Sequence, residues 1–387
     1  GKGHFAGEIR RLFLDNMHRT TVTLSADPEQ GAREAAQEAE ILAGVRAGLD
    51  EKALEATVAE TERLKALQEE VDDPALLAKI PTLTLADLPR ESRITPIETG
   101  HLGAARLFYH DLPTLGIVYL DLGFDLHVLD KDLLPYLPLF GRALLQTGTS
   151  REDFVSLTQR IGRTTGGIAQ HRGLSARQGG DGSAAWFFLS GKAVPDRVGD
   201  MLDIMGDVLL DARLDNRERF RQMALEEKAG FEARLVPGGN AIVNTRLNAG
   251  LTEAGWIAEQ MGGVCYLGFL RELVQRVDSD WESVAAALKR IRDTLFNRGR
   301  MVVNVTADGA LWARARGEIE GFLGRLPDGE FAFADWAIDY ARKSEGLIIP
   351  AQVNYVGKGA NLRALGFEMS GASSVVLKFL NTTYLWD

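Results

Sequence analysis

The 387-residue sequence has almost no cysteine, few histidines and no long apolar run. Its single cysteine, Cys265, cannot form a disulfide within the chain. The neighbours of Cys265 are mostly apolar, which favours a small buried hydrophobic residue over a nucleophile. No apolar run reaches the roughly 18–20 residues that a transmembrane helix needs. The sequence therefore predicts neither a disulfide framework nor a membrane span.

Positive charge is also scarce. The 44 Lys and Arg residues are outnumbered by 54 Asp and Glu residues, which gives a formal net charge of −10. This excess of negative charge argues against nucleic acid or a membrane as a partner. An apolar content of 45% and a charged content of 25% predict a globular chain with a sizeable core. A reduced compartment is compatible with one cysteine, and the cytoplasm is the location favoured.

Short zinc motifs are missing. In H-x-x-E-H, two histidines at positions i and i+4 share one face of a helix and bind the metal together. No two of the six histidines lie three to five residues apart: His4, His18, His101, His110, His127 and His171. A local two-histidine helical site is therefore excluded, while a site assembled from distant residues stays open. For His110 and His171 we predict surface or hydrogen-bonding roles, and for His18 a structural role.

Other catalytic and cofactor-binding patterns are weak. Residues 357–359, Gly-Lys-Gly, lack the third glycine and the acidic partner of a dinucleotide fingerprint. Ser373 and Ser374 have no nearby histidine and are predicted to cap a helix. The sequence therefore assigns no catalytic, cofactor-binding or metal-binding residue in this chain.

The N-terminal part predicts a helical hairpin followed by an extended linker. Asp27-Pro28 is typical of a helix start, and this helix should end at Gly48. Asp50 should cap a second helix, so that the two helices form an antiparallel hairpin. Three spaced prolines follow between residues 74 and 89. We assign residues 1–90 to a helical-hairpin hinge or linker.

The next part predicts an α+β domain over residues 91–297. Strand patterns cover 94–98, 106–110, 116–126, 167–177 and 184–193, with helices at about 132–147 and 150–165. Helical patterns then continue from about 195 to 297. Gly262-Gly263 should separate two of these helices, and Ser279 with Glu282 should form a capping box for a third. This order predicts a mixed or antiparallel sheet with helices packed on one face.

A further α+β domain of the same type should begin at residue 298. Patterns for a strand at 301–306, a helix at 309–324, a strand at 348–356 and a helix at 373–386 are too few to close a domain. We therefore expect residues 298–387 to be a truncated beginning. The absence of an initial methionine suggests that the sequence is cut from a longer chain.

Several spaced motifs resemble one family in its order along the chain. They are LDNMHRTTVTL at 14–24, YLPLFGRALLQTGT at 136–149, TTGGI at 164–168, GLTEAGWIAEQMGG at 250–263, YLGFLREL at 266–273 and VNYVGKG at 353–359. Together they are similar to presequence proteases, zinc metallopeptidases of the pitrilysin and insulysin superfamily. The resemblance implies a pitrilysin-like fold for this chain, comprising the hinge, the third domain and the start of the fourth.

The same resemblance implies a function. In the family, zinc lies in a first domain that would precede Gly1, so this segment should hold no cofactor and be inactive alone, while the parent holds zinc. Residues 27–72 would be the hinge, and the sheet of 93–194 would line a chamber for unstructured peptides. The implied partners are the N-terminal catalytic half of the same polypeptide and those peptides. The alternative is a non-catalytic scaffold or binding subunit of the same fold.

Overall fold

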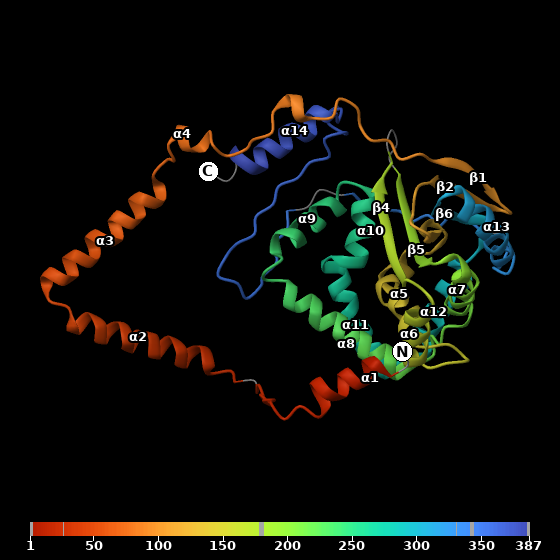
Figure 1. The fold of residues 1–387 in the computed structure, drawn as a ribbon, viewed down its shortest axis with the longest axis horizontal. Coiled ribbons are helices and arrows are strands. Elements are labelled where there is room, and N and C mark those ends of the chain that lie inside the picture. Colours follow the sequence, from red (N-terminus) through yellow and green to blue (C-terminus); the bar gives the residue numbers. More distant parts are fainter. Residues whose placement is uncertain (1–2, 26, 178–181, 330, 341–343, 385–387) are drawn as a thin grey trace. The chain divides into compact units, whose positions relative to one another are not determined.

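The chain divides into two compact units, residues 1–92 and 93–387. A computed structural model describes residues 3–25, 27–177, 182–329, 331–340 and 344–384. The first unit is helical (Figure 1). Its elements are α1 (His4–Ile9), a π-helical turn (Arg10–Leu14), α2 (Gln30–Gly48), α3 (Glu51–Glu69), α4 (Pro74–Leu77) and a 3-10 turn (Leu85–Asp87).

The joint between the two long helices of the first unit lies where the sequence places it. Helix α2 ends at Gly48, and the Asp50 carboxylate accepts the Ala53 amide at 2.7 Å, so Asp50 caps α3. The start of α2 differs from the prediction. Glu29 occupies the N-cap position, and Asp27 accepts the Glu29 amide at 3.0 Å one turn earlier.

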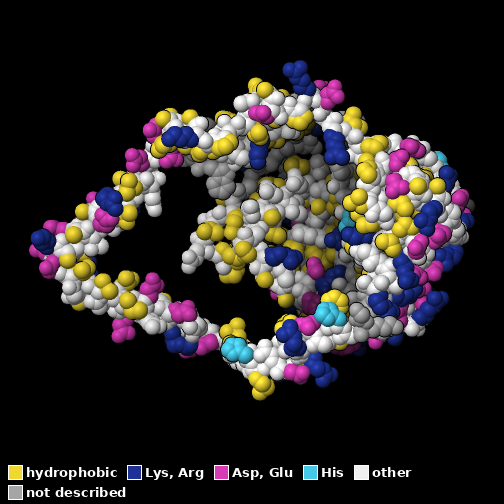
Figure 2. All heavy atoms as spheres, in the orientation of Figure 1, with side chains coloured by type: hydrophobic (Ala, Val, Ile, Leu, Met, Phe, Trp, Pro, Cys, Tyr) yellow, Lys and Arg dark blue, Asp and Glu magenta, His cyan; other side chains and the backbone are white. Residues whose placement is uncertain are grey.

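The predicted antiparallel hairpin has no packed seam. No residue of α2 or α3 is buried, and apolar side chains stand beside charged ones along both helices (Figure 2). The apolar side chains with about half or more of their surface exposed include Ile41, Leu42, Val45, Val58 and Leu64. Helix α2 is rich in alanine and α3 in charged residues, so neither offers a wide apolar stripe to the other. The hairpin prediction is wrong in this respect.

The second unit is built on a six-stranded sheet with the order β1-β2-β6-β3-β5-β4. Strands β2 and β6 are parallel, and all other neighbours are antiparallel. The predicted α+β class with a mixed sheet is therefore confirmed. The strands are β1 (Glu98–Leu102), β2 (Ala105–Asp111), β3 (Val118–Asp125), β4 (Ile168–Ala176), β5 (Ser183–Ala193) and β6 (Met301–Ala307).

Helices fill the connections between these strands (Figure 1). They are α5 (Leu137–Gln146), α6 (Phe154–Thr164), α7 (Val198–Asp211), α8 (Arg217–Arg234), α9 (Gly239–Ala249), α10 (Glu253–Gly262), α11 (Val264–Ser279), α12 (Trp281–Leu295), α13 (Gly309–Leu323) and α14 (Gly371–Phe379). Short 3-10 turns lie at Leu126–Val128, Lys131–Tyr136, Pro195–Arg197 and Arg298–Arg300, and a π-helical turn at Leu380–Tyr384.

The two faces of the sheet differ in burial. Along β5 and β6 every second residue is buried, and the residues between are mostly partly exposed. The buried set faces the helices: a Cβ on Gly191 would lie 2.9 Å from the Met201 sulfur of α7. Since side chains alternate across a strand, the described helices cover one face, as predicted, and leave the other open. We call this other side the open face.

The strand predicted to begin a further domain lies instead in the middle of this sheet. Strand β6 pairs with β2 on one side and with β3 on the other, and α13 packs against α7. The predicted boundary at residue 298 is therefore wrong. The pairing joins residues almost 200 positions apart, which a local pattern cannot reveal. No strand forms within 348–356; this coil packs on α9, where the Tyr355 hydroxyl donates to the Val236 carbonyl.

Other boundaries shift for local reasons. Strand β1 begins at Glu98 rather than ending there, after Pro96, which has no N–H to donate to a ladder. The helix predicted at 132–147 is split into a 3-10 turn containing Pro135 and the helix α5, which has Pro138 in its first turn. The helix predicted at 150–165 begins at Phe154, because Asp153 is its N-cap.

The helix joint at Gly262-Gly263 is confirmed, although its physical reason differs from the expected one. Gly263 has extended dihedral angles, and a Cβ there would lie 1.8 Å from the buried Glu259 carboxylate. Glycine is thus required for space rather than for a left-handed backbone. The capping box predicted from Ser279 is wrong: Asp280 caps α12, and its carboxylate accepts the Ser283 amide at 3.3 Å.

Phe296 lies at the centre of the core beneath the sheet. Its ring centroid is 4.9 Å from that of Phe124, 5.8 Å from that of Phe140 and 6.0 Å from that of Phe187. These four rings come from β3, α5, β5 and the end of α12, and all are almost fully buried. One ring therefore holds three separate elements together.

We predict that Phe296→Ala lowers the free energy of unfolding by about 3–5 kcal/mol, because it removes a buried ring and leaves a cavity. Denaturant unfolding followed by tryptophan fluorescence measures the effect. Phe379→Ala serves as the control, since Phe379 is 58% exposed. Similar losses for the two variants would contradict the central position of Phe296.

Candidate functional site

The six histidines are dispersed over the structure. His4 and His18 belong to the first unit, while His101, His110 and His171 lie on three different strands. In the ranges that the structure describes, no three His, Cys, Asp or Glu side chains form a group that could hold a metal ion. The residues present do not fit a zinc ion, so we assign no step of zinc chemistry to them. None of the described helices is long and apolar enough to cross a bilayer.

His127 is the centre of an ionic network, which we call the His127 network. It follows β3 directly, in the turn Leu126–Val128. Its Nδ1 lies 2.7 Å from Asp125 Oδ1 and its Nε2 lies 3.0 Å from Glu253 Oε1. The amide and hydroxyl of Ser183 donate to the same Glu253 oxygen at 2.9 and 2.6 Å. The network thus joins the end of β3, the start of β5 and the first turn of α10.

The electrostatics of the network are those of a charged imidazolium between two carboxylates. Burial alone would lower the pKa of His127, but its hydrogen bonds to Asp125 and Glu253, and their charges, outweigh burial and raise it. Burial would likewise raise the pKa of both carboxyl groups. For Asp125, the bonds to His127 and then Arg300 lower the pKa; for Glu253, those to Ser183 and His127 do so.

Aromatic rings enclose the imidazolium. The ring of Trp336 stacks on His127 with centroids 4.8 Å apart, and Phe333 meets it edge-on at 6.3 Å. The Trp336 indole N–H also donates to the Leu129 carbonyl at 2.8 Å, and the Ala334 amide donates to the His127 carbonyl at 2.8 Å. The segment 333–336 is therefore fastened to the end of β3 through His127.

A cavity of about 260 Å³ opens beside the network. Its lining comprises Asp125, His127, Arg177, Gly182, Ser183, Glu253 and Phe333. All the carboxylates in this lining are already paired with His127, Arg300 or Ser183. With its charges satisfied internally, the network is built to hold segments together rather than to transfer protons to a substrate.

The sequence analysis gave His127 no role, and the structure shows why. Asp125 and His127 are two residues apart, as in an Asx turn, which is a weak local signal. Glu253 comes from 126 residues further along the chain, and Ser183 lies 70 residues before Glu253. For His110 a hydrogen-bonding role was predicted: its Nδ1 contacts the Pro96 carbonyl at 2.7 Å and its Nε2 contacts Asn304 at 3.0 Å.

Cys265 is exposed, so its predicted burial is wrong. It lies in the first turn of α11, where its amide donates to the buried Glu259 carboxylate at 3.0 Å. That hydrogen bond draws the backbone inward and turns the thiol outward, toward Arg246 at 3.4 Å. The apolar neighbours in sequence do not cover the thiol, because the helix directs them to another face.

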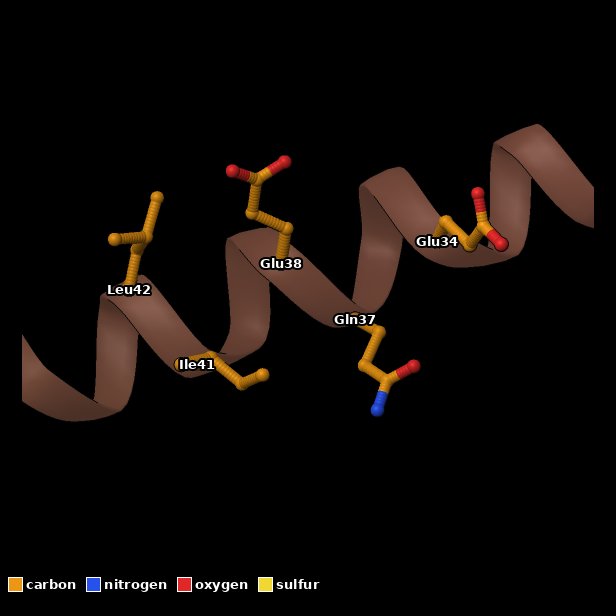
Figure 3. A pocket seen from close by; sticks show the side chains of 5 residues that line it. All are labelled: Glu34, Gln37, Glu38, Ile41 and Leu42. Atoms are coloured by element: carbon orange, nitrogen blue, oxygen red, sulfur yellow. The ribbon is translucent and has the colours of Figure 1, made fainter.

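In the first unit, α2 borders a shallow depression rather than an enclosed pocket. Figure 3 shows that its five lining side chains, Glu34, Gln37, Glu38, Ile41 and Leu42, all project from this one helix in different directions. Each of them is exposed. A ligand held by one helix face would keep most of its surface in water, so the depression is no candidate binding site.

The open face carries a second group of side chains. Asn304 on β6 donates to Asp121 on β3 at 2.9 Å, and it also contacts His110 on β2. On the other half of this face, the ring of His171 stacks on that of Phe188, with centroids 4.9 Å apart. Polar and aromatic groups thus lie in adjacent positions on a surface that the described helices leave uncovered.

Comparison with known proteins places the chain in a family. The family described as "Peptidase M16-C associated" matches residues 24–273. The chain belongs to this family. Over all 387 residues it is 37% identical to presequence protease 1, chloroplastic/mitochondrial, of Arabidopsis thaliana, covering 36% of that protein. It is 26% identical to protein HypA of Clostridium perfringens, over 99% of this chain and 39% of that protein.

This member of the peptidase-associated family therefore spans little more than a third of the length of these curated relatives. Among solved structures, a peptidase M16 inactive domain from Pseudomonas fluorescens matches with a TM-score of 0.45 and 16% identity, over 62% of this chain and 53% of that one. The predicted resemblance to presequence proteases is confirmed by the relatives. His127, Ser183 and Glu253 lie inside the family match, whereas β6 and Trp336 lie beyond it.

The pKa shifts predict how the His127 network stabilises the chain at different pH values. The raised pKa of His127 gives stability that is full below its ordinary 6.5 and is lost as pH rises through the folded value. The lowered pKa values of Asp125 and Glu253 give stability that is full above their ordinary 3.8 and 4.5 and is lost as pH falls through the folded values. The network should therefore contribute most between these limits.

We expect His127→Gln to lower the free energy of unfolding by about 3 kcal/mol near pH 6, because it leaves two carboxylates without their cation. The loss should shrink as pH rises, since the parent chain then loses the same charge. Unfolding curves at several pH values, followed by the fluorescence of Trp336 and its neighbours, measure it. His101→Gln on β1 is the control, and a loss independent of pH would contradict the ionic origin.

Proposed function

We propose that the chain is a non-catalytic part of a zinc metalloendopeptidase that degrades unstructured peptides inside a closed chamber. The observation that carries the proposal is the similarity to Arabidopsis presequence protease 1 over all 387 residues. The sequence itself has no H-x-x-E-H motif, so in this proposal the zinc and its general base belong to other residues of the parent protein. The partner is the N-terminal catalytic half of the same polypeptide.

The proposal gives each unit a task. The first unit, with its long exposed helices, would be the hinge between the two halves. The sheet of residues 93–194, together with β6, would form a wall of the chamber. The open face supports this assignment, because a peptide can reach its half-buried side chains without displacing a described helix. The cytoplasm is kept as the proposed location, with which a single cysteine is compatible.

We predict that the chain alone does not cleave a quenched, unstructured peptide, with or without added zinc. The parent protein should cleave it and should lose activity with a chelator. The measurement is the rise in fluorescence on cleavage, with the two proteins compared at equal concentration. Zinc-dependent cleavage by the chain alone would overturn the non-catalytic assignment. An inactive parent would instead favour a scaffold or binding subunit.

A further inference from the structure

Strand β4 is a nine-residue edge of the sheet with one free side. It pairs with β5, and no other described strand lies beside it. In β4 itself, every described backbone hydrogen bond to another strand goes to β5. The opposite edge, β1, is only five residues long. The longer edge is thus the one that offers a row of free main-chain groups.

The hydrogen-bond phase of β4 identifies those groups. The Arg177 amide donates to the Gly182 carbonyl, which makes this pair a hydrogen-bonded one at the end of the β4–β5 ladder. Paired positions alternate along an antiparallel ladder, and the register from Ile168 to Ala176 has no break. Odd-numbered residues therefore bond to β5. Even-numbered residues, Gln170, Arg172 and Leu174, direct their N–H and C=O groups outward.

The odd-numbered residues place their side chains on the open face, where they border a floor of rings. Phe188 lies flat there, because a Cβ on Gly123 would be 2.6 Å from its ring and a Cβ on Gly173 would be 3.1 Å from it. The exposed His171 stacks on Phe188 at an interplanar angle of 13°, and Trp186 adjoins Phe188 with centroids 6.4 Å apart. The row of rings ends at the free edge with His171.

The sequence of β4 leaves this edge unprotected. Natural sheets shield their edges with proline, lysine, a bulge or a short strand. Strand β4, Ile-Ala-Gln-His-Arg-Gly-Leu-Ser-Ala, has neither proline nor lysine, and its register is continuous. Its one charged side chain, Arg172, lies on the side of the helices. Outward N–H and C=O groups at every second residue select an extended main chain, which a helix cannot supply.

We propose that an extended peptide adds to the free edge of β4 and places an apolar or aromatic side chain beside His171, at the end of the ring floor. This rests on the proposed function, in which unstructured peptides enter the chamber, and it names a subsite on the non-catalytic wall. Opposite residues of neighbouring strands share one face of a sheet. The peptide residue opposite His171 therefore continues the row formed by His171 and Phe188.

The test is direct binding to the chain itself, without catalysis. The probes are fluorescent, unstructured nine-residue peptides with one central Phe, and fluorescence anisotropy measures affinity. Two versions carry backbone N-methyl groups at alternate residues, in opposite phases. We expect one phase to weaken binding more than tenfold and the other to leave it nearly unchanged, because only alternate amides face β4.

Exchanging the peptide Phe for Ser should weaken binding about fivefold, as expected for one ring contact. His171→Ala should weaken binding of the Phe peptide by a similar factor and leave the Ser peptide unchanged. His101→Ala on the opposite edge is the matched control. Equal binding of the two N-methyl phases would overturn the proposal. So would dimerisation of the chain that the peptide cannot compete with, because a second copy would then occupy β4.

The outcomes separate this inference from the proposed function. If no peptide binds while the parent protein still cleaves peptides and needs zinc, the subsite is wrong and the non-catalytic assignment stands. If the chain alone proves to be a peptidase, that assignment fails, and the phase dependence of the N-methyl peptides still decides whether β4 is a binding edge.

Discussion

The pairing of β6 between β2 and β3 is the interaction on which the second unit depends. Without β6, the hairpin β1–β2 would have no hydrogen-bonded neighbour in the sheet, and β3 would become an edge. Bringing residues 301–307 to residues 106–111 closes a loop of almost 200 residues, with a large cost in chain entropy. The core around Phe296 offsets this cost, because that ring lies just before β6 and packs against β3, α5 and β5.

The His127 network fastens what the sheet leaves loose. Its members come from the end of β3, the start of β5 and the start of α10, and the segment 333–336 stacks on it. Each member is costly to bury alone, and each is stabilised by the others. The network therefore couples four segments electrostatically at one end of the sheet, where the aromatic core under the other strands does not reach. Its charges are balanced within the unit.

Local patterns in the sequence predict the elements well and their partners poorly. Helix joints at Gly48 and Gly262-Gly263, and most strands, follow from capping residues, glycine and alternation. The place of β6, the pairing of His127 with Glu253 and the exposure of Cys265 all depend on contacts between distant residues, or on which way a helix turns. The apolar residues of α2 and α3 fit helical spacing, but spacing alone could not show that they lack a packed seam.

Two features of the second unit run against stability and share one location. The open face exposes aromatic rings, and the edge of β4 leaves main-chain groups unpaired, although a few substitutions to lysine or proline would protect that edge. The glycines at 123 and 173 even reduce the packing of the sheet so that Phe188 can lie flat. Such departures cost stability in an isolated domain, and they concentrate where a surface contacts something else. In an enclosing wall, that neighbour is whatever fills the enclosure, and an extended chain fits both the edge and the rings.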